Sequence, residues 1–137
     1  MIKTTGYSGT PLWKKLGITD KTRLLVLHEP AAYAQWLGID INPLRVKSGE
    51  VPGLVHLFVK DKKALLACLQ RSAPLCRKNP SLVIWVSWYK KAAGIATDLT
   101  EDIIRSEALR RQLVDVKVCA VSDEWSGLKL VVPLALR

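Results

Sequence analysis

Residues 82–86 read Leu-Val-Ile-Trp-Val, five apolar side chains in a row. Successive side chains of a strand point to opposite faces of its sheet, so a run without polar positions is typical of a strand buried on both faces. Two other runs are apolar on both faces but not free of polar residues, namely residues 23–28 (Arg-Leu-Leu-Val-Leu-His) and residues 54–59 (Leu-Val-His-Leu-Phe-Val). We therefore expect a parallel sheet covered on both sides, with residues 82–86 at its centre.

Helical segments separate these runs. Residues 30–37 are expected to form a helix that ends at Gly38, because glycine readily adopts the left-handed conformation that closes a helix. Asp61 is suited to cap a second helix, in which apolar residues recur at helical spacing. Asp98, with Glu101 three residues later, resembles the capping box of a third helix. The apolar residues that this third helix is expected to turn inward are Leu99, Ile103, Ile104, Ala108 and Leu109.

The last part of the chain has a different pattern. Apolar and polar residues alternate from 114 to 120, as in an antiparallel strand with one buried face. A turn at residues 122–127 returns the chain into a second strand at residues 128–132, so we expect a hairpin. Two weaker elements are a short helix at residues 11–16 and a weak strand at residues 44–46.

Strands that alternate with helices form layers, with helices on both faces of a mostly parallel sheet. The expected fold class is therefore α/β, a doubly wound and mostly parallel sheet that closes with a C-terminal antiparallel hairpin. No linker, repeat or low-complexity segment divides the sequence. Residues 1–137 are expected to form a single domain, with an N-terminal loop at residues 1–10.

Composition narrows the expected environment. Of the 137 residues 49% are hydrophobic, yet no apolar run approaches the roughly 20 residues that a membrane helix needs. The first residues hold no apolar segment typical of a secretion signal. The three cysteines, Cys68, Cys76 and Cys119, form no ligand cluster. We expect a cytoplasmic protein with reduced thiols, no membrane partner and no metal site.

The formal net charge of +9 predicts attraction to anions, whether small molecules or nucleic acid. Charge alone does not select among them. An apolar terminal hairpin can also leave a sheet edge free to pair with another copy of the chain. A homodimer is therefore one arrangement that the sequence allows.

The segment from Leu12 to Leu27, a helix, a polar turn and an apolar strand, resembles the beginning of class I methyltransferases, and the closing hairpin resembles the end of that fold. The resemblance implies a truncated, methyltransferase-like Rossmann fold. In such enzymes a glycine-rich loop after the first strand approaches S-adenosylmethionine, and a carboxylate after the second strand holds the ribose. Here no glycine lies between Leu27 and Gly38, and Lys47 takes the place of the carboxylate. We therefore expect no cofactor.

Other pieces of the sequence carry a second resemblance. They are Gly6–Leu12 (GYSGTPL), Lys14–Gly17 (KKLG), Trp85–Trp88 (WVSW), Lys90–Lys91, Thr97–Asp102 (TDLTED) and Trp125–Leu130 (WSGLKL). Together they resemble a family of small bacterial proteins of unknown function, and the match spans nearly the whole chain. The resemblance implies kinship and no known activity.

In open α/β sheets, ligands bind outside the carboxyl ends of the strands. Four segments are expected at this edge, residues 28–29, 47–49, 60–63 and 87–91. The lysines there that we expect to bind an anionic ligand are Lys60, Lys62, Lys63, Lys90 and Lys91. Lys62 and Lys63 would lie in the first turn of a helix, where the helix dipole disfavours cations, and an anionic ligand would explain their placement. The alternative is that these lysines are only solvated.

Trp88 and Tyr89 set aromatic rings beside these cations, a combination that can stack on bases or other flat rings. Trp88 is alternatively a cover over the core, which is the interpretation we favour because tryptophan is mostly buried in proteins. His28 and Glu29 follow the first strand and are candidate catalytic groups for proton transfer. His56 lies inside an apolar strand and is expected to be a hydrogen-bonded core residue.

These observations lead to three functional hypotheses. The first is a non-enzymatic binding or regulatory module that engages an anionic ligand at the carboxyl edge of the sheet. The second is a small transferase-like enzyme that uses the same cleft, and the third is a nucleic-acid-binding protein.

Overall fold

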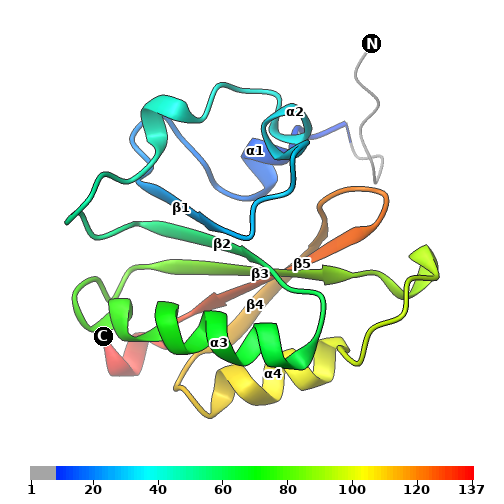
Figure 1. Ribbon diagram of the computed structural model, residues 1–137. Helices are drawn as coiled ribbons and strands as arrows, with labels where there is room; N and C mark the ends of the chain where they lie inside the picture. Colours follow the sequence, from blue (N-terminus) through cyan, green and yellow to red (C-terminus); the bar gives the residue numbers. More distant parts are fainter. Residues whose placement is uncertain (1–8) are drawn as a thin grey trace.

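The computed structural model describes residues 9–137 as a five-stranded sheet in the order β1-β2-β3-β5-β4 (Figure 1). The strands are β1 (Leu24–Leu27), β2 (Leu54–Phe58), β3 (Val83–Tyr89), β4 (Val114–Ala120) and β5 (Trp125–Val131). β1, β2 and β3 are parallel, and β5 is antiparallel to both β3 and β4. β4 therefore runs in the same direction as β1–β3, and β5 alone is reversed. This confirms the predicted α/β fold with its closing antiparallel hairpin, and β3 is the central strand.

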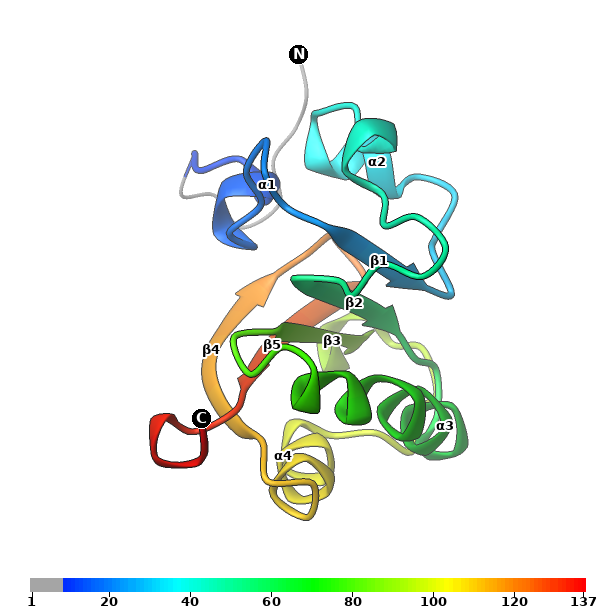
Figure 2. The same cartoon turned by 90° about the vertical axis from the view of Figure 1, so that its left-hand side faces the viewer.

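Helices cover both faces of this sheet. α1 (Leu12–Lys15) and α2 (Tyr33–Leu37) lie on one face, and α3 (Lys62–Ser72) and α4 (Glu101–Leu109) lie on the other (Figures 1 and 2). The doubly wound arrangement is therefore confirmed. The first eight residues, which include most of the expected N-terminal loop and the beginning of the Gly6–Leu12 piece, lie outside the described part.

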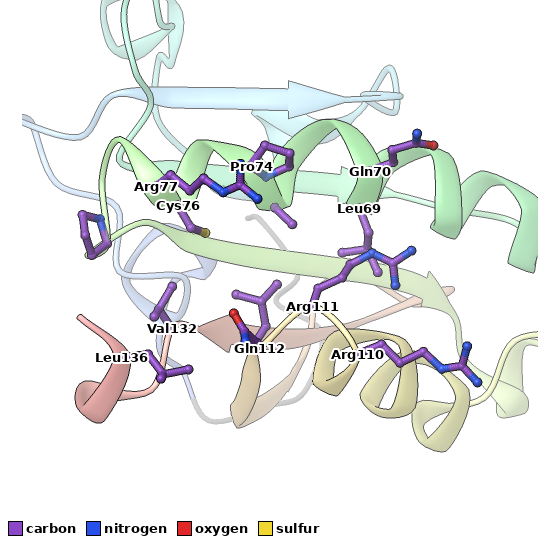
Figure 3. Close-up of a pocket in the computed structure, with 13 residues that line it drawn as sticks. Leu69, Gln70, Pro74, Cys76, Arg77, Arg110, Arg111, Gln112, Val132 and Leu136 are labelled. Atoms are coloured by element: carbon purple, nitrogen blue, oxygen red, sulfur yellow. The ribbon is translucent and has the colours of Figure 1, made fainter.

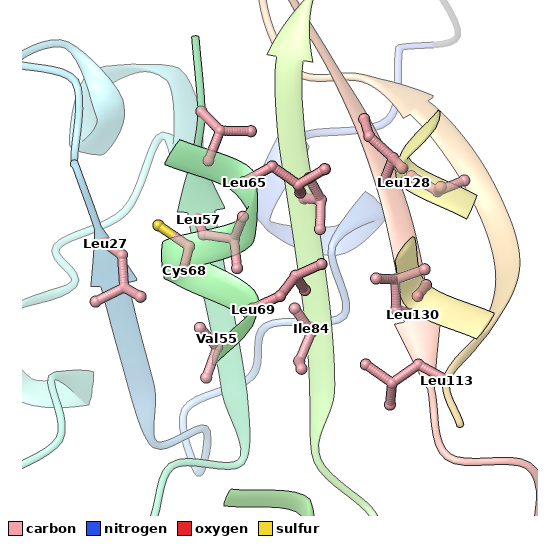
Figure 4. Packing of buried hydrophobic residues seen from close by; sticks show 14 of the residues in the cluster. Leu27, Val55, Leu57, Leu65, Cys68, Leu69, Ile84, Leu113, Leu128 and Leu130 are labelled. Atoms are coloured by element: carbon pink, nitrogen blue, oxygen red, sulfur yellow. The ribbon is translucent and has the colours of Figure 1, made fainter. Parts of the chain in front are cut away.

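The face under α3 and α4 holds an aliphatic core. Leu57 of β2, Val86 of β3 and Leu128 of β5 are fully buried there against α3 and α4. Figure 4 shows the inward side chains of the strands facing Leu65 and Leu69 of α3. Because every second residue of β2 and β3 faces this layer and the others face the second layer, both strands are apolar on both faces, with His56 and Ser87 as buried polar exceptions.

The face under α1 and α2 holds an aromatic core. Trp85 of β3 is fully buried and donates its indole N–H to the carbonyl oxygen of Leu16 at 3.0 Å, which fixes the end of α1 to the centre of the sheet. Tyr33 of α2, Phe58 of β2 and Trp125 of β5 are buried in the same layer. β3 thus contributes side chains to both the aliphatic and the aromatic core.

The connection from β1 to β2 differs from the expected second strand. Asn42–Leu44 is a 3₁₀ turn, and only Arg45 makes a bridge, a parallel one to Leu24 on the side of β1 away from β2. The expected strand at residues 44–46 is therefore wrong. Pro43, which has no backbone N–H, favours this turn over a strand.

Lys47 consequently does not follow a strand. Its backbone N–H donates to Glu50, and Glu50 pairs with Arg23 immediately before β1. The turn at residues 47–49 therefore lies towards the amino end of β1, and its expected place at the carboxyl edge of the sheet is wrong.

The chain changes direction between β1 and β2. After β1 it passes α2 and reaches the outer side of β1 at Arg45, and after β2 it passes α3 and reaches β3 on the other side. Such a reversal is a topological switch point, where loops diverge and leave a crevice at the carboxyl ends of the strands.

Two details of α4 differ from the sequence expectation. Its N-cap is Thr100, whose side chain accepts a hydrogen bond from the N–H of Ile103, while Asp98 bonds elsewhere. Leu109, expected to face inward, is 56% exposed, although its neighbour Ala108 in the last turn of α4 is buried, so Leu109 lies on the outer side of the helix. The expected capping box and the inward position of Leu109 are therefore wrong.

The edge strand β4 has no well-buried face. Val116 and Val118 are 54% and 49% exposed, whereas the alternating pattern predicted that they would be buried. A bulge between Asp115 and Lys117 interrupts the register with β5. A bulge and a lysine are features that discourage pairing of an exposed edge with another strand. The homodimer that the sequence allows stays untested by these contacts.

Gln112 closes α4 in a conformation that normally suits glycine. Its φ is 61°, and the N–H groups of Gln112 and Leu113 donate to the carbonyls of Leu109 and Ala108, as in a Schellman motif. We expect Gln112→Gly to raise the free energy of unfolding by about 0.5–1 kcal/mol, because glycine has no Cβ to strain there. Urea denaturation measures this change. Gln70→Gly, inside α3, is the control and should destabilise by a similar amount.

None of the helices described in residues 9–137 is long and apolar enough to span a bilayer.

Candidate functional site

A hollow of about 520 Å³ opens at the switch point, and we call it the switch-point hollow. Its lining residues come from the loop after β1, the end of β2, the start of α3, the end of β3 and the start of β5. They are His28, Glu29, Pro30, Phe58, Lys60, Asp61, Ala64, Tyr89 and Trp125. The volume falls within the range of small-molecule sites, and in open α/β sheets ligands bind in the crevice at this edge.

Aromatic rings form one wall of the hollow. The ring centroids of Tyr89 and Trp125 are 4.4 Å apart with planes tilted by 31°. Trp125 also meets the ring of Phe58 edge to face at 5.1 Å. The pair Tyr89–Trp125 is set by the sheet itself, because these two residues are directly opposite each other in the β3–β5 register. Phe58 and Trp125 are buried behind the wall, so Tyr89, which is only partly buried, is the ring that can contact a flat ligand.

A buried polar chain lies behind this wall. His56 stacks on Phe58 with centroids 4.3 Å apart, and its Nδ1 and Nε2 lie 2.7 Å from the hydroxyl oxygens of Tyr33 and Ser87 respectively. All three polar side chains are fully buried. Burial lowers the pKa of His56 to about 3 and, with help from Glu29, raises that of Tyr33. This confirms the prediction of a core histidine, which here holds Phe58 in place.

His28 has an unusual backbone at the mouth of the hollow. Its φ is 59°, in the left-handed region that residues with a Cβ seldom adopt. In many folds of this type a glycine follows the first strand, because the turn there needs such a conformation. Here a histidine adopts it, and its exposed side chain lines the hollow. Strained residues of this kind are often found at functional sites.

Glu29 is already paired. Its two carboxylate oxygens accept hydrogen bonds from the Arg45 guanidinium at 2.7 and 2.9 Å. This bidentate pair raises the pKa of Arg45 and joins the loop after β1 to the single bridge on the outer side of that strand. The charge of Glu29 is therefore compensated before any ligand arrives, and the side chain acts as a support for the loop.

The start of α3 carries its own carboxylates. Asp61 accepts a hydrogen bond from the N–H of Ala64 at 2.8 Å, as predicted for the N-cap. Asp98 accepts one from the N–H of Lys62 at 2.8 Å, and Thr97 donates its hydroxyl to the carbonyl oxygen of Lys60. Two aspartates thus supply the negative charge that a lysine-bearing first turn needs, which accounts for Lys62 and Lys63 without a ligand.

The predicted ligand-binding residues do not all meet at the hollow. Lys60 and Tyr89 line it, whereas Lys62 and Lys63 are exposed outside its lining. Lys90 and Lys91 follow Tyr89 at the same edge of the sheet, also outside the lining. Trp88 is buried in the core under α3 and α4, as the favoured interpretation predicted.

Four lining residues were not singled out from the sequence. Phe58 lies in a strand that looked wholly structural, and Trp125 was expected in a turn. Pro30 and Ala64 carry no chemical signal of their own. Only the alternation of β2 could have indicated Phe58, since it places every second side chain on one face. Within residues 9–137, no group of three or more histidine, cysteine or acidic side chains could hold a metal ion.

Comparison with known proteins shows the fold alone. No protein-family model matches the sequence, and no curated protein matches it. Among solved structures, a protein of the NADB-Rossmann superfamily from Streptococcus agalactiae is similar, with a TM-score of 0.54 and 12% sequence identity. The match covers 94% of this chain and 70% of that one. The chain thus has a Rossmann-like fold, while the resemblances to methyltransferases and to the bacterial family stay predictions.

Proposed function

We propose that this Rossmann-like chain is a non-enzymatic binding module that holds a small anionic molecule with a flat ring in the switch-point hollow. One observation carries the proposal. The hollow combines an aromatic wall, formed by Phe58, Tyr89 and Trp125, with a lysine, Lys60, among its other lining residues. Apolar lining with a few well-placed polar groups is the usual composition of a small-molecule site.

The lining holds two carboxylates and one lysine, and both carboxylates already have partners within the protein. Glu29 is neutralised by Arg45, and Asp61 caps α3. Lys60 makes no ion pair with any described residue, so its charge is available to a ligand. A hydrogen bond between an ammonium and an anion contributes roughly 1.5–3 kcal/mol where water is partly excluded.

We expect Lys60→Ala to weaken the binding of adenosine 5′-monophosphate at least about tenfold, because the variant loses the charge-assisted contact. Calorimetry or ligand-observed NMR measures the dissociation constant. The matched control is Lys47→Ala, which removes an exposed lysine in the turn towards the amino end of β1, outside the lining, and should change the affinity less than about twofold.

Adenosine without phosphate separates the contributions of ring and charge. It should bind the parent protein weakly and bind Lys60→Ala equally weakly. No saturable binding of the monophosphate at about 10 mM, or equal effects of the two substitutions, would contradict the proposal.

Lys62, Lys63, Lys90 and Lys91 are proposed as outer cations that attract the ligand. Their contribution acts through solvent, so it should disappear at high salt, whereas that of Lys60 should persist in part. The nucleic-acid alternative has less support, because burial of Trp88 leaves Tyr89 as its stacking group.

A small transferase-like enzyme is the second candidate, and the left-handed backbone of His28 favours it. His28 lines the hollow and could accept a proton from a bound molecule, whereas Glu29 is held by Arg45. Calorimetry with S-adenosylmethionine tests this candidate. Two results together would favour the enzyme over the binding module. S-adenosylmethionine would bind saturably to both the parent and His28→Gln, and only the parent would turn it over.

A further inference from the structure

We propose that a second groove, at the opposite edge of the sheet, binds a phosphate monoester attached to an apolar group. This arginine groove has a volume of about 640 Å³ and lies between the ends of α3 and α4 (Figure 3). Its charged lining residues are Arg77, Arg110 and Arg111. Pro80, which precedes β3, and Val132, which follows β5, place the groove at the amino ends of the parallel strands, away from the switch-point hollow.

The cations of the groove are all arginines. Three of the eight arginines of the chain line it, and none of the lysines among the described residues does. A planar guanidinium presents a fork of N–H donors that matches two oxygens of a phosphate or carboxylate, which an ammonium does not. The selection of arginine over the more abundant lysine therefore favours recognition of an oxyanion over general solubility.

The charge of the groove matches a dianion. Arg111 donates to the carbonyl oxygen of Glu107 at 2.8 Å and to its carboxylate at 3.1 Å, and Arg110 lies 4.0 Å from the same carboxylate. Arg77 has no ion pair within residues 9–137. Three guanidinium groups and one carboxylate leave two positive charges. A phosphate monoester carries −1.5 to −2 near neutral pH.

The arginines come from both sides of the groove. In Figure 3, Arg77 extends beside Pro74 at the end of α3, while Arg111 and Gln112 rise from the end of α4 on the other side. Arg110 points outward at the rim, and its side chain is 76% exposed. Arg77 and Arg111 can thus hold one phosphate from two directions, with Arg110 adding charge nearby.

Gln70 and Gln112 are the uncharged polar residues of the lining, and most of its other residues are apolar. Among these, Leu136, Pro74 and Pro80 are exposed, whereas Leu69 and Leu113 are buried beneath the groove. Inorganic phosphate would leave this surface in water, whereas an aryl or alkyl phosphate would cover it and gain its transfer free energy, roughly 25 cal/mol for each Å² removed from water. The groove therefore suits an amphiphilic ligand.

The test uses phenyl phosphate as the probe and follows the amide signals of the whole chain by NMR. We expect saturable shifts at residues 74–80 and 110–113. Arg77→Ala should weaken binding at least about fivefold, and Arg77→Lys, which keeps the charge and loses the fork, should recover only part of the loss. Arg71→Ala is the control, since Arg71 lies on α3 and outside this lining, and it should bind like the parent.

A second probe, phenol, lacks the phosphate group and separates its contribution from that of the ring. Phenol binding as tightly as phenyl phosphate, or an equal loss in Arg71→Ala and Arg77→Ala, would overturn the proposal. So would the absence of shifts at residues 74–80 and 110–113 up to about 10 mM probe. Shifts confined to the switch-point hollow and lost in Lys60→Ala would overturn this second site while leaving the proposed function intact.

Discussion

Lowering the pH from 7 to 4 is expected to remove about 3 kcal/mol from the free energy of unfolding through His56 alone. In the folded protein burial lowers the pKa of His56 to about 3, and in the unfolded chain it returns to the ordinary value of 6.5. Below pH 6.5 the unfolded chain therefore binds a proton that the folded protein does not. Stability is lost as the pH falls from about 6.5 towards 3, at up to roughly 1.4 kcal/mol per pH unit.

Urea denaturation at pH 7, 5.5 and 4 in the parent, His56→Gln and His28→Gln measures this effect. His56→Gln should be less stable than the parent at pH 7, because glutamine cannot bond both Tyr33 and Ser87 in the same geometry. Its stability should fall less steeply with acid, since the titrating group is gone. His28→Gln, which removes the exposed histidine and leaves His56 in place, is the control. Equal slopes for the parent and His56→Gln would show that His56 is not the group responsible.

Replacing Trp85 with alanine is expected to destabilise the protein by about 3–5 kcal/mol. The ring is fully buried at the centre of the sheet, and its N–H binds the carbonyl oxygen of Leu16. Alanine would leave a cavity in the aromatic core and a buried carbonyl without its donor. α1 would lose its attachment to β3, so the loss should reach beyond the site of substitution.

Two further variants separate the effect of the cavity from that of the lost hydrogen bond. Trp85→Phe keeps most of the ring and removes the N–H, so it should recover a large part of the stability and leave a loss of about 1–3 kcal/mol. Trp36→Ala is the control, because Trp36 is only partly buried against the same core. Thermal and urea denaturation of all three give the comparison. A loss in Trp85→Ala no larger than that in Trp36→Ala would contradict the central role of Trp85.

The sequence predicted the parallel strands because their pattern depends on local chemistry. β1, β2 and β3 lie where the continuous apolar runs indicated, and Asp61 caps α3 as its position before a helical pattern implied. β3 extends three residues beyond the apolar run at residues 82–86, because its pairing with β5 continues through Ser87 to Tyr89. That extension depends on a strand about forty residues away along the chain, which no local pattern contains.

The site was less predictable because it depends on contacts between distant segments. Asp98 looked like the cap of its own helix, yet its carboxylate bonds the N–H of Lys62, 36 residues earlier. Glu29 looked like a candidate base, and its partner Arg45 lay in a segment expected to be a strand. Of the lysines expected around one ligand, only Lys60 lines the hollow. The sequence indicated which charged residues lie near the carboxyl edge of the sheet. Contacts between distant segments decided which of those charges have partners within the protein.

The position of β5 has a consequence for synthesis on the ribosome. β5 lies between β3 and β4, although β4 comes earlier in the chain. A nascent polypeptide that ends at Ala120 therefore holds a β4 segment with no neighbour to pair with, and β3 still lacks the strand on one side. The sheet closes only after Trp125–Val131 leaves the exit tunnel. Until then β3 presents an open strand edge, which is a surface prone to misassembly with other chains.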